Sequence, residues 1–179
     1  MKALALLFFS AVVAFGGDKP KVDRAAMVIV EKRIDQGFEK LFPDNPYLLL
    51  GMTRGVYLDG YGAVFSAEVN LVLTAGLSPF RPRVTKEEVA QVKQQKLQRL
   101  PELRACMKDA LISAALSMDM VPPEEQIVLA VSLFRHSWED VNGVPQQILM
   151  QVARKTIVEL KTAGADRKMI EESIQVREY

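Results

Sequence analysis

The dipeptide Asp59-Gly60 places the strongest constraint on how this chain can fold. Asp-Gly between two apolar segments is typical of a two-residue hairpin turn, in which both central residues take a positive φ. The turn predicts antiparallel strands over residues 47–58 and 61–73. In this register Leu50 faces Val69 and Val56 faces Ala63.

The same register separates the side chains of the two strands onto two faces. The apolar face would carry Leu48, Leu50, Met52, Val56 and Leu58 with Ala63, Ala67, Val69 and Leu71, and Arg54 opposite Phe65 is its exception. The other face would carry Gly51, Thr53, Gly55, Ser66, Glu68 and Asn70. That second face would be either a shallow binding surface or simply hydrated. A bulge at Tyr61-Gly62 would change the pairing near the turn.

Helices are predicted on both sides of this hairpin, over residues 22–41, 86–118 and 145–163, from apolar residues at steps of three and four. Thr85 and Glu88 form a capping-box signature at the start of the second helix, and Pro101 would kink or restart it. Pro145 would begin the third.

The segment 126–135 contains a run of apolar residues that predicts a central strand covered on both faces. Asp166 is expected to cap a short helical turn, and residues 173–179 predict a weak final strand. The result is an α+β fold, with a small sheet packed against helices.

The first seventeen residues predict a signal peptide. Lys2 precedes a run from Ala3 to Phe15 that is apolar apart from Ser10, and Ala14 and Gly16 fit the small-residue positions before a cleavage site. Thirteen residues of helix reach only about 20 Å, which is too short for a permanent span. We therefore expect residues 1–17 to be removed and residues 18–179 to form one domain. The protein would be exported to the periplasm or the extracellular space, without a stable membrane span after cleavage.

Charge and cysteine content narrow the function. Loss of Lys2 leaves 22 basic and 22 acidic side chains, and this neutrality argues against nucleic acid as a partner. Cys106 is the single cysteine, so an intrachain disulfide is impossible. We expect a small helical core residue there, and an intermolecular disulfide is the alternative outside the cytosol.

Three groups of residues are candidate binding sites. The hairpin tip would present Tyr57, Asp59 and Tyr61 to a partner, because tyrosine combines apolar area with a hydroxyl. Arg81 and Arg83, two apart on an extended segment, would bind a carboxylate or phosphate, or would only be solvated on a connecting loop.

The third group, His136 and Trp138, lies just after the central strand with Glu139 and Asp140. An imidazole beside carboxylates could hold a metal or transfer protons. The other interpretation is a polar connection with a half-buried tryptophan, since one histidine without cysteine partners is an uncommon zinc site.

The segment Tyr57-Leu58-Asp59-Gly60-Tyr61-Gly62-Ala63-Val64-Phe65, with the order of elements after it, resembles an uncharacterised group of exported bacterial proteins. That resemblance implies export and no particular activity. The sequence thus predicts a non-catalytic binding or assembly factor of the cell envelope, without a cofactor, whose partner is an envelope protein or a small anionic ligand. The alternative is a small hydrolase or metal-dependent enzyme using His136 with Glu139 or Asp140.

Overall fold

A computed structural model describes residues 22–43, 47–74 and 83–179 of the chain. Within these residues six strands form one mixed sheet and four helices pack on it. The elements are α1 (Arg24–Glu39), β1 (Leu48–Leu49), β2 (Arg54–Leu58), β3 (Gly62–Asn70), α2 (Lys86–Ser117), β4 (Gln126–Leu133), β5 (Gln147–Ala153), α3 (Arg154–Thr162), α4 (Arg167–Glu172) and β6 (Gln175–Glu178). The predicted α+β fold class is confirmed.

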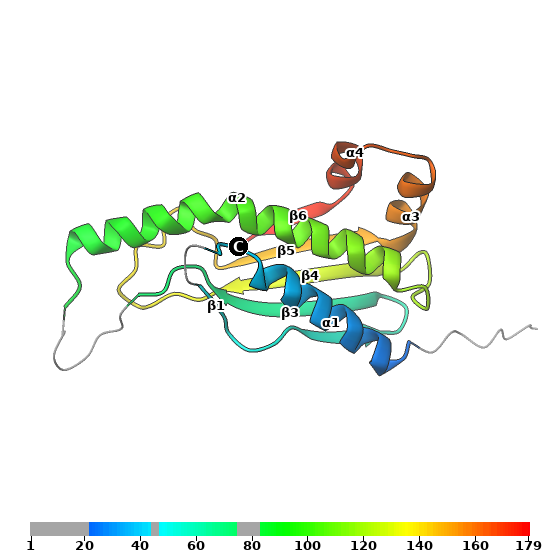
Figure 1. The fold of residues 1–179 in the computed structure, drawn as a ribbon, viewed down its shortest axis with the longest axis horizontal. Coiled ribbons are helices and arrows are strands. Elements are labelled where there is room, and N and C mark those ends of the chain that lie inside the picture. The colour runs from blue at the N-terminus through cyan, green and yellow to red at the C-terminus, as the bar shows by residue number, and fades with distance from the viewer. Residues whose placement is uncertain (1–21, 44–46, 75–82) are drawn as a thin grey trace, which may run out of the picture.

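The sheet has the order β1–β3–β4–β5–β6, and β2 continues the edge beside β3. β3 and β4 are parallel and are connected by the long helix α2, whereas the other neighbours are antiparallel. The carboxyl ends of β3 and β4 therefore lie at one end of the sheet and the β2–β3 hairpin tip at the other (Figure 1).

Both helices predicted in the first two thirds of the chain form as expected. The Asp23 side chain caps α1, and Thr85 and Glu88 form the predicted capping box of α2. α2 continues through Pro101. Its inner stripe is buried over the whole C-terminal half, at Leu103, Met107, Leu111, Ala114 and Met118.

The predicted helix over 145–163 is wrong in its first half. Residues 147–153 form β5, and the helix α3 begins only at Arg154. Ile148, Met150 and Val152 are buried at every second position, and β5 pairs with β4 along its length. The hydrogen bonds to β4 satisfy the backbone N–H and C=O groups that a helix would have satisfied within itself. Pairing with β4 therefore decides the conformation of this segment, although its apolar residues are also spaced as in a helix.

The strand predicted over 126–135 is β4, and its predicted burial on two faces is partly right. α1 and α2 cover one face of the sheet, and α3 and α4 extend the same layer beside the C-terminal half of α2 (Figure 1). On the opposite face of β4, Val128 is buried, whereas Ala130 and Ser132 stay partly exposed. The core thus lies between a single helical layer and the sheet.

The hairpin forms where Asp59-Gly60 predicts it, with a different register. The predicted register pairs Val56 with Ala63 and Leu50 with Val69. In the structure Val56 pairs with Val64 and Leu49 with Val69, so the two parts of the hairpin differ from the predicted register by one residue, in opposite directions. Asp59 has a negative φ, whereas Gly60 has a positive φ of 78°. Leu58 pairs with Gly62, so the loop consists of residues 59–61. Four residues, 50–53, lie opposite only two residues of β3, 67 and 68. The edge strand therefore bulges at this point and is divided into β1 and β2.

The predicted faces are right for β3 and reversed for β2. Ala63, Ala67 and Val69 are buried as expected, together with Phe65. On β2, in contrast, Val56 and Leu58 are 52% and 46% exposed.

Gly55 explains the reversal. A Cβ at this position would lie 2.7 Å from side-chain atoms of both Met27 and Phe65. The missing side chain lets Phe65 fill the core directly beneath α1, so the apolar residues on either side of Gly55 face outward.

Two carboxylates of α1 cover the free edge of β2. Glu31 accepts from the Gly55 amide at 2.6 Å, and Asp35 accepts from the Thr53 amide at 2.9 Å. Glu31 and Asp35 are four residues apart on the helix, a rise of about 6 Å, and Thr53 and Gly55 are two residues apart on the extended chain, about 6.6 Å. Each carboxylate therefore lies level with one amide. Arg24 binds both Glu31 oxygens and the Gly55 carbonyl. The amides of Thr53 and Gly55 are therefore not available to pair with a strand of another chain.

Candidate binding pocket at the carboxyl ends of β3 and β4

The hairpin tip is bound to the turn that precedes β4. The Glu125 carboxylate accepts from the Tyr57 hydroxyl at 2.8 Å and from the Gly60 amide at 3.1 Å. The Gln126 amide donates to the Tyr61 carbonyl at 2.8 Å. Desolvation by burial, reinforced by the Glu125 hydrogen bond, raises the pKa of Tyr57 to about 12. Of the two tyrosines proposed to meet a partner, Tyr57 turns inward to Glu125 and Tyr61 stays 45% exposed.

At the other end of the sheet, a buried ion pair anchors the loop that follows β4. The Lys96 ammonium contacts the Glu139 carboxylate and donates to the Phe134 carbonyl at 2.9 Å. The two charged side chains are only 3% and 5% exposed. The other Glu139 oxygen accepts from the His136 amide at 3.0 Å. This carboxylate therefore holds loop backbone against α2.

A second ion pair supports the same loop nearer the surface. Lys93 donates to Asp140 at 2.7 Å, and the Asn142 amide donates to the other oxygen of Asp140 at 3.0 Å. The Lys93 hydrogen bond, followed by the one from the Asn142 backbone, lowers the pKa of Asp140. Both carboxylates near His136 are thus engaged by lysines of α2.

The rings of this loop stack on one another. His136 lies parallel to Trp138, with ring centroids 5.3 Å apart and planes at 10°, and Phe134 meets His136 edge-on at 5.0 Å. In the described part of the chain, no hydrogen bond joins the His136 imidazole to a carboxylate. The structure therefore brings His136 and Glu139 together through backbone only, and the stack positions Trp138.

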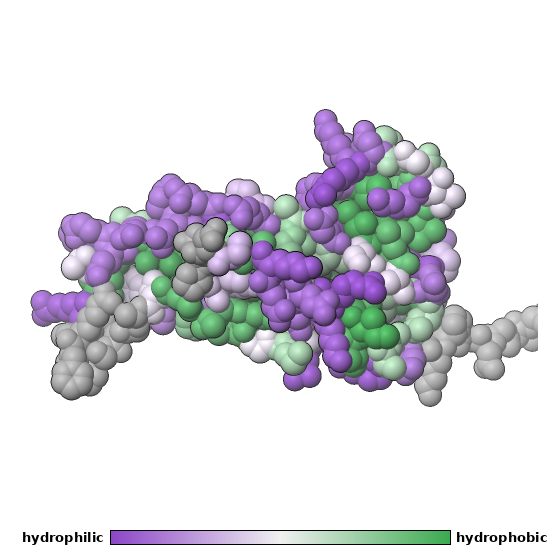
Figure 2. Space-filling model, in the orientation of Figure 1, coloured by the Kyte–Doolittle hydropathy of each residue, from purple (hydrophilic) through white to green (hydrophobic). Residues whose placement is uncertain are grey.

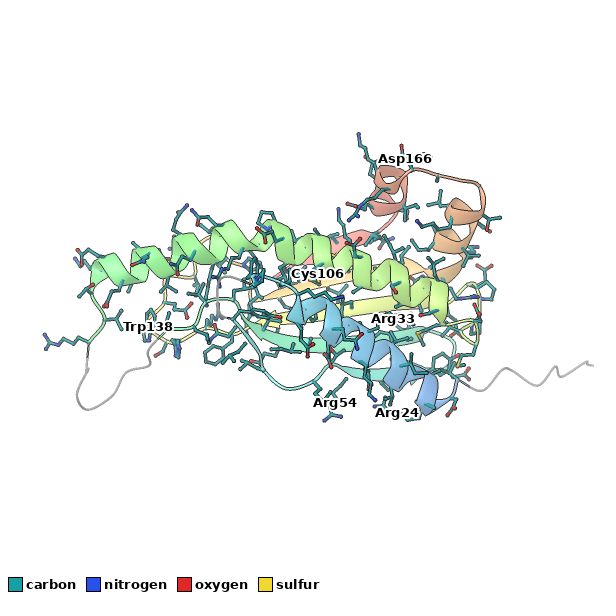
Figure 3. All side chains as sticks on the ribbon, viewed as in Figure 1. Arg24, Arg33, Arg54, Cys106, Trp138 and Asp166 are labelled. Carbon is teal, nitrogen blue, oxygen red and sulfur yellow. The ribbon has the colours of Figure 1, made fainter. Side chains whose placement is uncertain are left out.

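Trp138 lines a pocket of about 290 Å³ between this loop, the segment after β3 and the first turns of α2. Figure 3 shows Trp138 at the end of the molecule where α2 begins, far from Arg24 and the hairpin tip. The other lining residues are Val72, Leu73, Thr74, Val84, Glu88, Gln91, Val92 and Gln95. Ligands of sheets with parallel strands bind outside the carboxyl ends of those strands, which is where this pocket lies.

Two buried polar atoms of the pocket residues lack a hydrogen-bond partner within the ranges that the structure describes. Trp138 Nε1 and Thr74 Oγ1 are both shielded from solvent, and neither makes a hydrogen bond to the described residues. A buried polar group without a partner costs about 1–3 kcal/mol, so native proteins contain few of them. Four other buried atoms of the described residues share this state, namely Asp35 Oδ2, Thr53 Oγ1, Asn70 Oδ1 and Arg154 Nε.

Some pocket residues were missed by the sequence analysis. Thr74, Gln91 and Gln95 belong to no motif, because they meet only where the end of β3 approaches the start of α2. Of the two arginines proposed to bind an anion, Arg83 is exposed beside Val84 of the pocket, and Arg81 lies outside the described residues.

A larger groove of about 490 Å³ lies between α1 and α2. In Figure 2 pale green surface separates the hydrophilic outer surfaces of these helices near the middle of the face. Gly37, Cys106 and Ala110 are among the small residues that line it, and Figure 3 labels Cys106 there. Burial, with a contribution from Asp109, raises the pKa of the Cys106 thiol to about 11, so the thiol is protonated at neutral pH. An intermolecular disulfide at this cysteine stays a prediction.

Two searches of the described residues bear on metals and membranes. Residues 22–43, 47–74 and 83–179 contain no group of three or more His, Cys, Asp or Glu side chains placed to hold a metal ion. Across the same ranges, none of the helices combines the length and apolar character needed to cross a membrane.

No protein-family model, curated protein or solved structure matches this chain.

Proposed function

We propose that this chain is an exported, non-catalytic binding protein whose ligand occupies the pocket beside Trp138. The observation that supports the proposal is a pocket of about 290 Å³, partly walled by Trp138, outside the carboxyl ends of the parallel strands β3 and β4.

Binding is favoured over catalysis by the state of the ionisable groups near the pocket. A general base must be free to reach the proton that it removes. Glu139 and Asp140 are instead engaged by Lys96 and Lys93. The alternative enzyme, with His136 acting beside one of these carboxylates, would require an ion pair to open first.

Export is supported by the cationic start, the apolar run and the small residues of the first seventeen positions. The test is N-terminal sequencing of the protein recovered outside the cytoplasm of its own cells. A mature chain that begins near Gly17 is expected. Uncleaved protein confined to the cytoplasm would refute export.

The binding proposal is tested by native mass spectrometry of the protein purified from its own cells, together with fluorescence. Trp138 is the single tryptophan of the chain, so its emission reports on the pocket directly. We expect a bound small molecule of defined mass, and a saturable emission change when the purified chain is titrated with the small-molecule extract of those cells.

Two matched variants locate the ligand. Thr74→Phe fills the pocket beside Trp138 and is expected to abolish both signals. Ser113→Phe places the same ring in the α1–α2 groove and is expected to leave them unchanged. Absence of both signals in the unmodified protein, or their persistence in a folded Thr74→Phe protein, would refute the proposal.

A further inference from the structure

We propose that two copies of this chain associate face to face through the side of the sheet that the helices leave uncovered. This side, the open face, lies opposite α1 and α2 and is formed by the strands β2 to β6 (Figure 1). It shares no residue with the pocket beside Trp138, so the dimer does not depend on the proposed ligand.

Strand pairing determines which side chains belong to the open face. Successive residues of a strand point to opposite faces, and Phe65 is buried on the helical side. Its neighbour Val64 therefore points to the open face, together with its partners Val56 on β2 and Val128 on β4. The same alternation places six apolar residues of four adjacent strands on this face, namely Val56, Leu58, Val64, Val128, Ala130 and Leu149.

Five of these six side chains reach the solvent. Val56 and Leu58 are 52% and 46% exposed. Val64, Ala130 and Leu149 are partly exposed, and Val128 in the middle of the group is buried. Single exposed apolar residues are ordinary on protein surfaces, but a contiguous group with a polar rim is typical of a protein–protein interface.

The directions of the central strands also favour a second layer on this face. β3 and β4 are parallel, and sheets of parallel strands are usually covered on both faces. Among the described residues, helices cover only one face of this sheet. A sheet from a second molecule would supply the other layer, at the spacing of about 10 Å that packed sheets adopt.

The rim of the group indicates that the second molecule is a copy of this chain. Its charged residues are Arg54, Glu68 and Arg177, which carry both signs. The other polar residues of the face are uncharged, namely Ser66, Gln126, Ser132, Gln147, Gln151 and Gln175. A strongly charged partner would find few matching groups here, whereas an apolar centre with an uncharged rim is complementary to itself across a two-fold axis.

The dimensions of the open face suit a small, reversible interface. Five strands about 4.8 Å apart are about 24 Å wide, and strands of seven residues, the length of β5, are about 23 Å long. The product is about 550 Å² for each copy and about 1,100 Å² for the pair, at the lower end of specific interfaces. We therefore expect a dissociation constant in the micromolar range.

The edges of the sheet compete poorly with this face. At β2, Glu31 and Asp35 occupy the amides of Gly55 and Thr53, so a strand of another chain cannot pair there. At the opposite edge, β6 has only four residues, and Arg177 and Glu178 are charged. Short, charged edge strands are protected against pairing with other chains.

The first test is sedimentation velocity of the mature chain from about 1 to 300 µM, the range in which an interface of this size associates. We expect the sedimentation coefficient to rise from that of a monomer to that of a dimer. Val56→Lys and Leu149→Lys, at two separate places on the open face, should each weaken the dimer at least tenfold. Ile29→Lys is the control, because Ile29 is 58% exposed on α1, and it should dimerise as the unmodified chain does.

The second test locates the interface without disturbing its apolar residues. In a Cys106→Ser background, Ser66→Cys places a nitroxide label on the open face and Lys32→Cys places one on α1. Pulsed electron resonance of the dimer should give label separations of about 10–30 Å at position 66, since packed sheets lie about 10 Å apart. Separations at position 32 should be longer.

Three outcomes would overturn the proposal. One is a chain that stays monomeric over the whole concentration range. Another is a dimer that folded Val56→Lys and Leu149→Lys proteins retain, which would point to the edge of β6. The third is a dimer lost in Ile29→Lys, or with shorter separations at position 32 than at position 66, which would place the interface on the helical side.

Discussion

The two ends of the sheet differ in how their polar groups are used. At the hairpin end, both oxygens of Glu125 are occupied, by the Tyr57 hydroxyl and the Gly60 amide. At the carboxyl ends of β3 and β4, the buried atoms Trp138 Nε1 and Thr74 Oγ1 have no hydrogen-bond partner among the described residues. The sequence marks both ends as candidate sites. At the first, Glu125 binds the tip back onto the domain, whereas the second carries a pocket beside Trp138.

This difference teaches that side-chain types alone do not identify a binding site. Tyrosines with an aspartate at a turn suit a partner surface, yet one glutamate binds the tip back onto the domain. Arg154, at the start of α3, contacts the turn before β4 and has one donor without a partner among the described residues, Nε, but the same guanidinium donates to Asp119 and to the Val121 carbonyl. At the pocket end, the ion pairs of Lys93 with Asp140 and of Lys96 with Glu139 support the loop that carries Trp138.

The largest expected effect is that of Lys96→Met at the pocket end. Removing one member of a buried ion pair leaves the other charge uncompensated, so we expect a loss of about 3–5 kcal/mol in the free energy of unfolding. Urea denaturation measures it. Lys93→Met, at the more exposed pair with Asp140, is the control and should cost under about 1 kcal/mol. Equal losses of unfolding free energy in the two variants would show that burial does not determine the cost of breaking these ion pairs.

At the hairpin end, Glu125→Ala should cost about 1–3 kcal/mol, because two hydrogen bonds are lost and the Tyr57 hydroxyl is left without its acceptor. Ligand affinity at the pocket should not change. Glu124→Ala is the matched control, since that side chain is 74% exposed and pairs only with Lys155 among the described residues. A Glu125→Ala protein with weakened ligand binding would contradict a purely structural role for this end.

A smaller effect at the hairpin end should depend on pH. Because burial and Glu125 raise the pKa of Tyr57 to about 12, the folded state keeps this proton after the unfolded state begins to lose it near pH 10. The stability from Tyr57 is therefore complete below about pH 10 and decreases as the pH rises toward 12. Urea unfolding over this range should show a steeper decline for the unmodified protein than for Tyr57→Phe. Parallel declines would refute the coupling to Glu125.

The smallest expected effect on stability is that of Thr74→Val. The Thr74 hydroxyl has no partner in the described part of the chain, so its removal should change the free energy of unfolding by less than about 0.5 kcal/mol or increase it. Thermal unfolding without ligand provides the measurement. A loss above about 1 kcal/mol would show that the hydroxyl is already satisfied within the protein and would remove the contrast between the two ends.

Much of the fold could be predicted because it depends on neighbours in the chain. The caps of α1 and α2 join residues two or three apart, and Asp166 caps α4 in the same way. The prediction failed for β5, whose strand conformation depends on β4 more than a dozen residues away. It also failed for the hairpin register, because Gly55 must fit between Met27 and Phe65.

Less of the candidate site could be predicted. His136 and Trp138 were identified from their place after an apolar strand, and Trp138 does line the pocket. Thr74, Gln91 and Gln95 carry no local signal and enter the site through the β3–α2–β4 crossover. Arg81 and Arg83, whose predicted role is anion binding, remain untested.

The sequence by itself determined where α1 and α2 begin, where the chain reverses at Gly60 and which face of β3 is buried, because these features depend on hydrogen bonds and apolar spacing within a few residues. Tertiary structure alone decided the hairpin register, the strand β5 and the difference between a bound tip and a pocket with unpaired polar atoms. Those depend on partners such as Glu125 for Tyr57, 68 residues apart, and no local pattern encodes which distant group will arrive to make the bond.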